Sequence, residues 1–194
     1  SRGRELVEGV FIENKKVIYR TGNLERVIIS LEDIPLLGQH NLENVLAAIA
    51  AAGSIGADLK VIPKVIADFK GMEHRLEFVR ELGGVKFYND SKATNVDAAA
   101  KSIGAFDGGV LLILGGKEKG GGFSALRGHI KEKVKSVFLV GSAAKRIGAE
   151  IHGVTNIVQC KEVPNAVRLA FKEAKPEDTV LLAPACASFD QFEN

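Results

Sequence analysis

Cysteine, charge excess and long apolar runs are all scarce in this sequence, and each scarcity argues against a class of protein. The only two cysteines among 194 residues, Cys160 and Cys186, do not stand in metal-ligand spacing, so we expect buried thiols in a reducing compartment. Lysine and arginine number 26 against 24 aspartates and glutamates, which gives no electrostatic reason to expect a nucleic-acid or membrane partner. No apolar run approaches the roughly 20 residues of a membrane span, and no signal-peptide pattern opens the chain. These absences predict a cytoplasmic protein.

Two nucleotide-binding signatures are also missing. The glycine-rich runs match neither the G-x-x-x-x-G-K-[ST] spacing of a P-loop nor the G-x-G-x-x-G dinucleotide fingerprint. A length of 194 residues suits one large domain or two small ones, and a hydrophobic fraction of 46% is enough for a core. The chain opens on Ser1 without a methionine and stops at Asn194 just beyond a polar cluster, so we expect both ends to be cuts in a longer protein.

The first third of the chain is predicted to contain a small antiparallel unit followed by two helices. Three short strands are expected, over residues 9–12, 17–19 and 27–29. Apolar residues at helical spacing predict a helix over residues 42–52, with Asn41 as its N-cap and Gly53 as its stop. Asn41 and Asn44 place two amides near the positive end of this helix, where amides can bind an adenine edge, with capping as the alternative for Asn41. A second helix is predicted over residues 62–69.

The remaining two thirds follow a different pattern, and we place a domain boundary between residues 1–72 and 73–194. A β-hairpin is predicted over residues 76–88, with Gly83 and Gly84 at its turn. Four apolar runs that read as strands follow, at residues 110–114, 136–140, 156–158 and 179–183. The predicted helices cover residues 95–103, 123–134, 142–151 and 163–174. Continuous apolar strands that alternate with helices predict a Rossmann-like three-layer α/β domain with a mostly parallel sheet.

The densest group of polar residues follows the second hairpin strand, in the Asn-Asp-Ser-Lys-Ala-Thr-Asn run at residues 89–95. It combines an acid, a cation, two hydroxyls and two amides at the carboxyl end of a strand, where open α/β sheets bind ligands. The alternative is helix capping, because Asn, Asp, Ser and Thr all favour the N-cap position. One such residue is enough for a cap, so we favour a binding loop.

Two further strand ends carry polar residues. The run at 115–122 offers glycine backbone that can approach an anion closely, although a plain surface loop explains it as well. The run at 184–192 contains Ser188, for which a simple cap is the alternative. Because these ends belong to one parallel sheet, we expect them to converge on one edge. Lys92 and Lys119 at that edge would suit a small anion such as a carboxylate or a phosphate.

Five segments together resemble the Mur ligases in order and approximate spacing. They are residues 38–44, 74–75, 89–95, 115–119 and 184–192. The resemblance covers the chain from about Leu36 onward and is closest to the members that add D-glutamate. It implies an ATP- and Mg²⁺-dependent ligase of peptidoglycan precursor synthesis. Such an enzyme phosphorylates the carboxylate of UDP-N-acetylmuramoyl-L-alanine to an acyl phosphate, which the amino group of D-glutamate then attacks.

The resemblance also assigns roles to residues. Asn41 and Asn44 would lie near the adenine, and Arg75 and Asp90 would bind the rest of the nucleotide. The D-glutamate site would be formed by Lys92, Thr94, Lys119, Ser188 and Phe189. The resemblance places the P-loop, the metal ligands and the uridine-binding domain upstream of Ser1, so no catalytic residue and no metal ligand is assigned within this chain.

The same resemblance makes residues 1–72 the C-terminal part of the central ATP-binding domain. Residues 73–194 would form the amino-acid-binding domain, cut short at its end. We therefore expect the isolated chain to be inactive as a ligase. The complete protein is expected to be a monomer that binds small molecules and neither nucleic acid nor membrane.

The chain departs from the family pattern at three positions. Lys117 stands where the family has an acidic residue, Phe189 where leucine is common, and Asn194 before the aromatic residue that closes the amino-acid pocket. Two alternatives stay open. One is another Mur ligase or a folylpolyglutamate synthetase, which would differ in the amino acid accepted, and the other is a non-catalytic Rossmann-like module that binds a small molecule.

Overall fold

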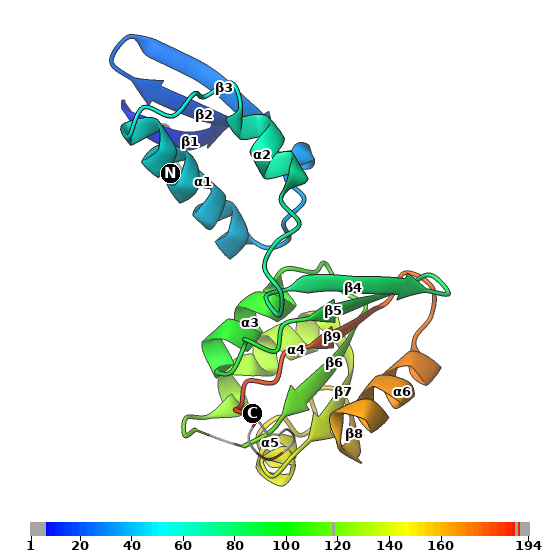
Figure 1. Cartoon of the computed structure of the whole chain (residues 1–194). Coiled ribbons are helices and arrows are strands. Elements are labelled where there is room, and N and C mark those ends of the chain that lie inside the picture. Colours follow the sequence, from blue (N-terminus) through cyan, green and yellow to red (C-terminus); the bar gives the residue numbers. More distant parts are fainter. Residues whose placement is uncertain (1–6, 118, 189, 191–194) are drawn as a thin grey trace. The chain divides into compact units, whose positions relative to one another are not determined.

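The computed structural model describes residues 7–117, 119–188 and 190. The chain divides into two compact units, Ser1–Gly71 and Met72–Asn194, and each unit has its own hydrophobic core. Figure 1 shows the first unit in blue to cyan-green and the second in green to red. Within the described ranges, no helix combines the length and the apolar composition that crossing a membrane would require.

The first unit is a three-stranded antiparallel sheet covered by two helices. Its elements are β1 (Gly9–Glu13), β2 (Lys16–Thr21), β3 (Leu24–Ser30), the short 3₁₀-helix η1 (Leu31–Asp33), α1 (Gln39–Ser54) and α2 (Ile62–Asp68). Alternate residues of β2, Val17 and Tyr19, belong to the same core cluster as Val45 and Ile49 of α1. The predicted strands and helices are confirmed here as elements, although their ends differ.

The predicted ends of α1 are wrong. The helix begins two residues before Asn41, with Gly38 at the N-cap, and Asn41 lies in the first turn, where its Nδ2 donates to the carbonyl of Leu37 at 2.8 Å. Gly53 does not stop the helix, which continues to Ser54. Instead, Gly53 allows close packing, because a Cβ at this position would fall 2.3 Å from Cε2 of Tyr19. The first turn is polar, so the apolar spacing did not reveal it.

The second unit is built on a six-stranded sheet in the order β4-β5-β9-β6-β7-β8. Its strands are β4 (Glu77–Leu82), β5 (Val85–Asn89), β6 (Val110–Gly115), β7 (Val134–Val140), β8 (Asn156–Lys161) and β9 (Thr179–Leu182). β4 and β5 form the predicted antiparallel hairpin, and every other neighbouring pair is parallel. The last of the described strands, β9, lies in the interior of the sheet, between β5 and β6 (Figure 1).

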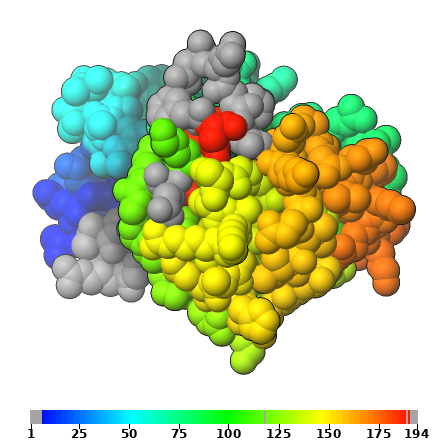
Figure 2. Space-filling model, turned by 90° about the horizontal axis from the view of Figure 1, so that it is seen from below, coloured from blue at the N-terminus to red at the C-terminus, as the bar shows by residue number. Residues whose placement is uncertain are grey.

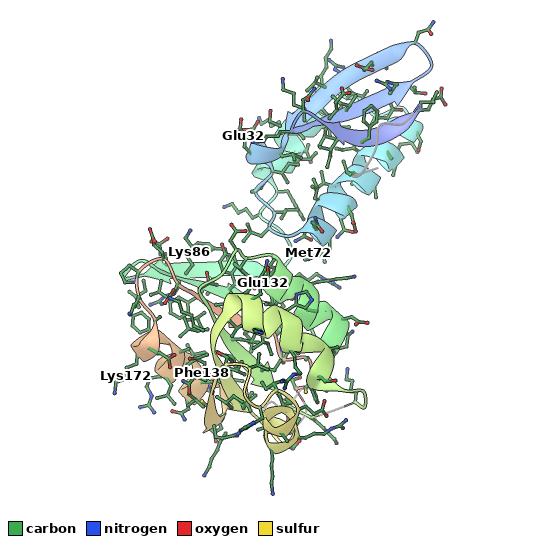
Figure 3. All side chains as sticks on the ribbon, turned by 180° about the vertical axis from the view of Figure 1, so that it is seen from behind. Glu32, Met72, Lys86, Glu132, Phe138 and Lys172 are labelled. Carbon is green, nitrogen blue, oxygen red and sulfur yellow. The ribbon has the colours of Figure 1, made fainter. Side chains whose placement is uncertain are left out.

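Helices cover both faces of this sheet, as predicted. They are α3 (Val96–Gly104), the 3₁₀-helix η2 (Phe123–Leu126), α4 (Arg127–Lys133), α5 (Ala144–Glu150) and α6 (Val163–Glu173). In β6, Leu112 and Leu114 pack with α3, α4 and α5, whereas Leu111 and Ile113 point to the opposite face and pack with α6. Phe138 of β7, labelled in Figure 3, lies on the α6 side. The fold is therefore a three-layer α/β sandwich with a mixed, mostly parallel sheet.

The strand order decides where the polar loops meet. Because β9 lies between β5 and β6, the loops that follow these three strands are neighbours along the carboxyl edge of the sheet. They are the same three loops in which the sequence concentrates its polar residues. This edge is the place where open α/β sheets bind their ligands.

Candidate functional site

Backbone hydrogen bonds join the three polar loops into one continuous rim. The N–H of Ala185, after β9, donates to the carbonyl of Ala93, after β5, at 2.8 Å. Lys117, after β6, and Ala187 exchange two backbone hydrogen bonds of 2.8 and 2.9 Å, which form an isolated antiparallel bridge. The loop after β9 is thus fixed on both sides by its neighbours.

The rim continues to the loop after β7. Gly116 donates its N–H to the carbonyl of Val140 at 3.0 Å and accepts the N–H of Ala143 at 2.9 Å. The N–H of Ser142 donates to Oδ2 of Asp190 at 2.7 Å. Figure 2 shows this face of the second unit, where the red end of the described chain lies beside the yellow segment that contains α5.

Two glycines make this close joining possible. Gly115 and Gly116 have φ angles of +126° and +135°, which side-chain-bearing residues rarely adopt. A Cβ on Gly115 would lie 2.1 Å from the carbonyl oxygen of Val140, and one on Gly116 would lie 2.4 Å from that of Ala187. These two glycines at the end of β6 therefore allow close backbone packing where the loop begins, in addition to any ligand that the loop binds.

A hollow of about 300 Å³ opens on this rim. It lies between the start of α3 and the end of the glycine-rich loop, and its lining residues are Thr94, Asn95, Val96, Asp97, Lys119, Gly120, Gly121, Gly122, Ala125 and Ala185. Two of the five residues expected to bind D-glutamate, Thr94 and Lys119, thus line the same hollow. Their side chains make no hydrogen bond or ion pair with any other described residue.

The loop at residues 89–95 divides its polar residues between structure and surface. Asn89 accepts the backbone N–H two residues further on at 3.0 Å, and its Nδ2 lies 2.9 Å from Nδ1 of His74. Asn95 caps α3, since its Oδ1 accepts the N–H of Ala98 at 2.8 Å. The capping alternative is correct for Asn95, while Thr94 is left to face the hollow.

Asp90 is buried, with 8% of its surface exposed. Its Oδ2 accepts a short hydrogen bond from the hydroxyl of Ser102 in α3, and its backbone N–H continues the sheet by donating to Leu182 at 2.8 Å. Asp90, which we expect to bind the nucleotide, therefore already has one structural partner, the hydroxyl of Ser102. Ser102 was not found from the sequence, because a serine in the middle of an amphipathic helix carries no sign of the residue that it faces.

Lys92 and Ser188 share this edge of the sheet but do not line the hollow. Lys92 is exposed, and its backbone N–H donates to the carbonyl of His74 at 3.1 Å. Ser188 is also exposed and directly follows Ala187, which bridges to the glycine-rich loop. Lys92, Lys119 and Ser188 are thus on one edge of the sheet.

The other expected site residues are distributed as follows. Arg75 is exposed near the start of the second unit, where its backbone N–H donates to Met72 at 3.2 Å. Asn41 and Asn44 belong to α1 of the first unit, with Asn41 half-buried and Asn44 exposed. Phe189 lies outside the described residues.

A charged pair on α5 was also missed by sequence reasoning. Glu150 accepts hydrogen bonds from Arg146 and from the backbone N–H groups of Phe123 and Ser124. Desolvation, the largest single influence, raises the pKa of Glu150, but the bonds from Arg146 and the two N–H groups together lower that pKa below its ordinary value. Phe123 and Glu150 are 27 positions apart, a distance over which the sequence shows no pattern that links them.

Mg²⁺ has no evident site here. Across residues 7–117, 119–188 and 190, no three histidine, cysteine, aspartate or glutamate side chains gather in a group that would hold a metal ion. We therefore assign no described residue to the divalent ion that the family resemblance implies.

Comparison with protein families gives a match to the family described as "Mur ligase, glutamate ligase domain", over residues 74–186. This range includes all but the outermost residues of the rim. The chain belongs to the Mur ligase family.

Curated relatives agree with this membership, and a solved structure shares the fold. The Mur ligase chain is 48% identical to the UDP-N-acetylmuramoylalanine–D-glutamate ligase of Acidobacterium capsulatum, over 100% of its own length and 42% of that protein. It is 51% identical to the ligase of the same name from Solibacter usitatus, over 87% of its length and 38% of that protein. The solved structure of E. coli FolC in complex with DHPP and ADP has a TM-score of 0.69 at 21% identity, covering 95% of this chain and 44% of that one. The chain thus spans less than half the length of the relatives that it matches.

Proposed function

We propose that this Mur ligase chain is part of an ATP-dependent ligase that joins D-glutamate to UDP-N-acetylmuramoyl-L-alanine in peptidoglycan precursor synthesis. The observation that carries the proposal is the hollow at the carboxyl edge of the sheet, which Thr94 and Lys119 line together. The curated relatives, which are named as ligases of D-glutamate, support the choice of amino acid.

The chemistry of the hollow suits an amino acid with two carboxylates. Lys119 supplies a positive charge and Thr94 a hydroxyl donor, and both groups hydrogen-bond carboxylates well. Val96 and Asp97 form the first turn of α3, where backbone N–H groups precede the first intrahelical bonds and the helix dipole favours an anion. The carboxylate of Asp97 adds a negative charge at the same hollow, which suits the ammonium group of an amino acid.

The reaction proceeds in two steps. The carboxylate oxygen of the UDP-linked L-alanine attacks the γ-phosphorus of ATP, so that ADP leaves and an acyl phosphate forms. The amino nitrogen of D-glutamate then attacks the acyl carbon, the bond from that carbon to the phosphate oxygen breaks, and the new amide loses a proton. The described residues contribute to the second step by orienting D-glutamate, because a nucleophile fixed in the right geometry reacts far faster than a free one.

We propose Asn41 and Asn44 for the adenine, and Arg75 and Asp90 for the rest of the nucleotide, as the family resemblance implies. Residues 1–72 would then be the C-terminal part of the ATP-binding domain and residues 73–194 the amino-acid-binding domain. We further propose Lys92, Ser188 and Phe189 as D-glutamate contacts from the same rim, and a monomeric cytoplasmic enzyme as the complete protein.

A hybrid protein tests the proposal. In it, the 194 residues replace the aligned segment of the Acidobacterium capsulatum relative, and that unaltered relative serves as the positive control. We expect phosphate release that requires both UDP-N-acetylmuramoyl-L-alanine and D-glutamate, and that L-glutamate, L-lysine and meso-diaminopimelate do not support. Turnover with one of those other amino acids, or with a folate acceptor, would contradict the proposal and favour another Mur ligase or a folylpolyglutamate synthetase.

Substitution at the hollow tests the site. Lys119→Ala removes the cation and is expected to raise the KM for D-glutamate by about tenfold or more, as the loss of a charge-assisted hydrogen bond does. Lys117→Ala is the matched control, because Lys117 is an exposed lysine of the same loop that does not line the hollow. Equal effects of the two substitutions would show that Lys119 acts only through net charge.

A further inference from the structure

The end of the glycine-rich loop depends on anchors from outside the loop. Gly120 and Gly121 have φ angles of +90° and +91°, and a Cβ at either position would meet no atom within 4 Å. Neither packing nor a restricted backbone therefore fixes this stretch. One anchor comes from α5, where Nη2 of Arg146 donates to the carbonyl of Gly121 at 2.6 Å.

Glu150 provides the second anchor. Its Oε2 accepts the backbone N–H groups of Phe123 at 2.5 Å and Ser124 at 3.1 Å, at the point where η2 begins. The N-cap residue of η2 is Gly122, which has no side chain to satisfy these donors. The Glu150 carboxylate thus acts as the cap from another helix.

The two anchors are coupled to each other and to α4. Oε1 of Glu150 accepts from Nε of Arg146 at 2.9 Å, so that one carboxylate fixes both the guanidinium and the start of η2. Nη1 of Arg127 donates to the carbonyls of Glu150 and His152, at 2.9 and 3.1 Å, and ties the end of α5 to the start of α4. The guanidinium carbon of Arg146 also lies 5.8 Å from the centre of the Phe123 ring.

We propose that the Arg146–Glu150 pair positions Lys119 against Thr94, and so determines how tightly the second carboxylate of the amino acid is bound. This inference rests on the proposed function. Lys119 and Gly121, whose carbonyl Arg146 binds, line the same hollow, and the N–H groups that Glu150 binds follow directly after this stretch. Arg146 and Glu150 themselves do not line the hollow. They are positioning residues, which act on the substrate through the loop.

Two measurements on Glu150→Gln test the proposal. In the hybrid ligase, we expect the KM for D-glutamate to rise by about tenfold, as when a charge-assisted hydrogen bond is lost, while kcat and the KM for ATP stay within about twofold. In the 194-residue chain, we expect faster amide hydrogen exchange over residues 119–124. Arg146→Lys keeps the positive charge but loses the several N–H donors of the guanidinium, so we expect smaller increases in the KM for D-glutamate and in the exchange rate. Lys145→Ala, an exposed neighbour on α5, is the control.

The outcomes separate this inference from the proposed function. An unchanged KM for D-glutamate, or equal rises for D-glutamate and ATP, would overturn the positioning role. Unchanged exchange over residues 119–124 would overturn the anchoring itself. If Glu150→Gln does not fold, the KM for D-glutamate and the exchange over residues 119–124 are measured on Arg146→Lys, and the same outcomes decide. A wild-type hybrid that turns over without D-glutamate would overturn the proposed function, while the exchange experiment would still decide whether the pair holds the loop.

Discussion

The backbone N–H of Ala185 donates to the carbonyl of Ala93 at 2.8 Å, which fastens the loop after β9 to the loop after β5. The Ala-Cys-Ala-Ser segment and the Asn-Asp-Ser-Lys-Ala-Thr-Asn segment follow strands that pair in the sheet, and this bond joins the two segments beyond the ends of those strands. The hollow that we propose for D-glutamate opens where these loops meet the glycine-rich loop. Its shape therefore depends on the bonds between loops, and four predictions test these bonds and the chemistry of the chain.

Gly116→Ala is expected to destabilise the chain by about 3 kcal/mol, because the added Cβ is both overpacked and forced into a φ angle that suits glycine. That Cβ would lie 2.4 Å from the carbonyl oxygen of Ala187. Gly128→Ala is the matched control, since Gly128 lies in α4 with no atom within 4 Å of a Cβ. It should leave stability unchanged or raise it by up to about 1 kcal/mol. Chemical unfolding measures both, and equal costs would contradict the prediction.

Ser102→Ala is expected to cost about 1–3 kcal/mol, because it leaves the buried carboxylate of Asp90 without its hydroxyl donor. A double-mutant cycle with Asp90→Ala checks the cause, since the cost of Ser102→Ala should shrink once Asp90 is absent. Ser124→Ala, at an exposed serine of η2, should change stability by less than about 0.5 kcal/mol. Additive effects of Ser102→Ala and Asp90→Ala would show that the two side chains do not stabilise each other.

The contribution of Glu150 to stability should depend on pH. Its hydrogen bonds lower the pKa in the folded chain, so the stabilisation is fully present above the unfolded pKa of about 4.3 and is lost as the pH falls through the folded value. The difference in unfolding free energy between wild type and Glu150→Gln should be constant above about pH 5 and shrink below pH ~4. Denaturant unfolding over this range measures it, and a difference that grew on acidification would have the wrong sign.

The isolated 194-residue chain should show no ligase turnover. Phosphoryl transfer needs a loop that holds the phosphates and a metal ion, and the sequence contains no glycine-lysine P-loop. A coupled phosphate-release assay with ATP, D-glutamate and the UDP-linked acceptor measures this directly. Release of phosphate above the no-enzyme rate would show that the chain carries phosphoryl-transfer groups that we have not identified.

Periodicity predicted the elements of this fold well and their ends less well. The continuous apolar runs of β6 and β7 and the Gly83-Gly84 turn are local signals, so the hairpin and the three-layer arrangement followed from them. The start of α1 did not, because Gln39 and His40 are polar and add nothing to the apolar periodicity of the helix. The position of β9 between β5 and β6 is a long-range property, on which local spacing has no bearing.

In the candidate site, too, some residues were predicted from the sequence and others were missed. Thr94 and Lys119 were expected at one edge because polar residues follow strands of one sheet, and both line the hollow. Ser102, Asp190 and Glu150 were missed, since each acts through a bond to a residue far away in the sequence. A serine within a helix or a glutamate at its end is common on any surface, so only the coordinates distinguish these side chains from solvent-exposed ones.

The interior place of β9 also affects how the second unit is made on the ribosome. A nascent chain that has not yet reached Thr179 contains the other strands and the helices described for this unit, yet β5 and β6 have no partner on their facing edges. Until Thr179–Leu182 emerges, those two edges expose unpaired backbone that another polypeptide can occupy. The order of strands thus makes the interval before β9 emerges a stage at which this unit needs protection from aggregation.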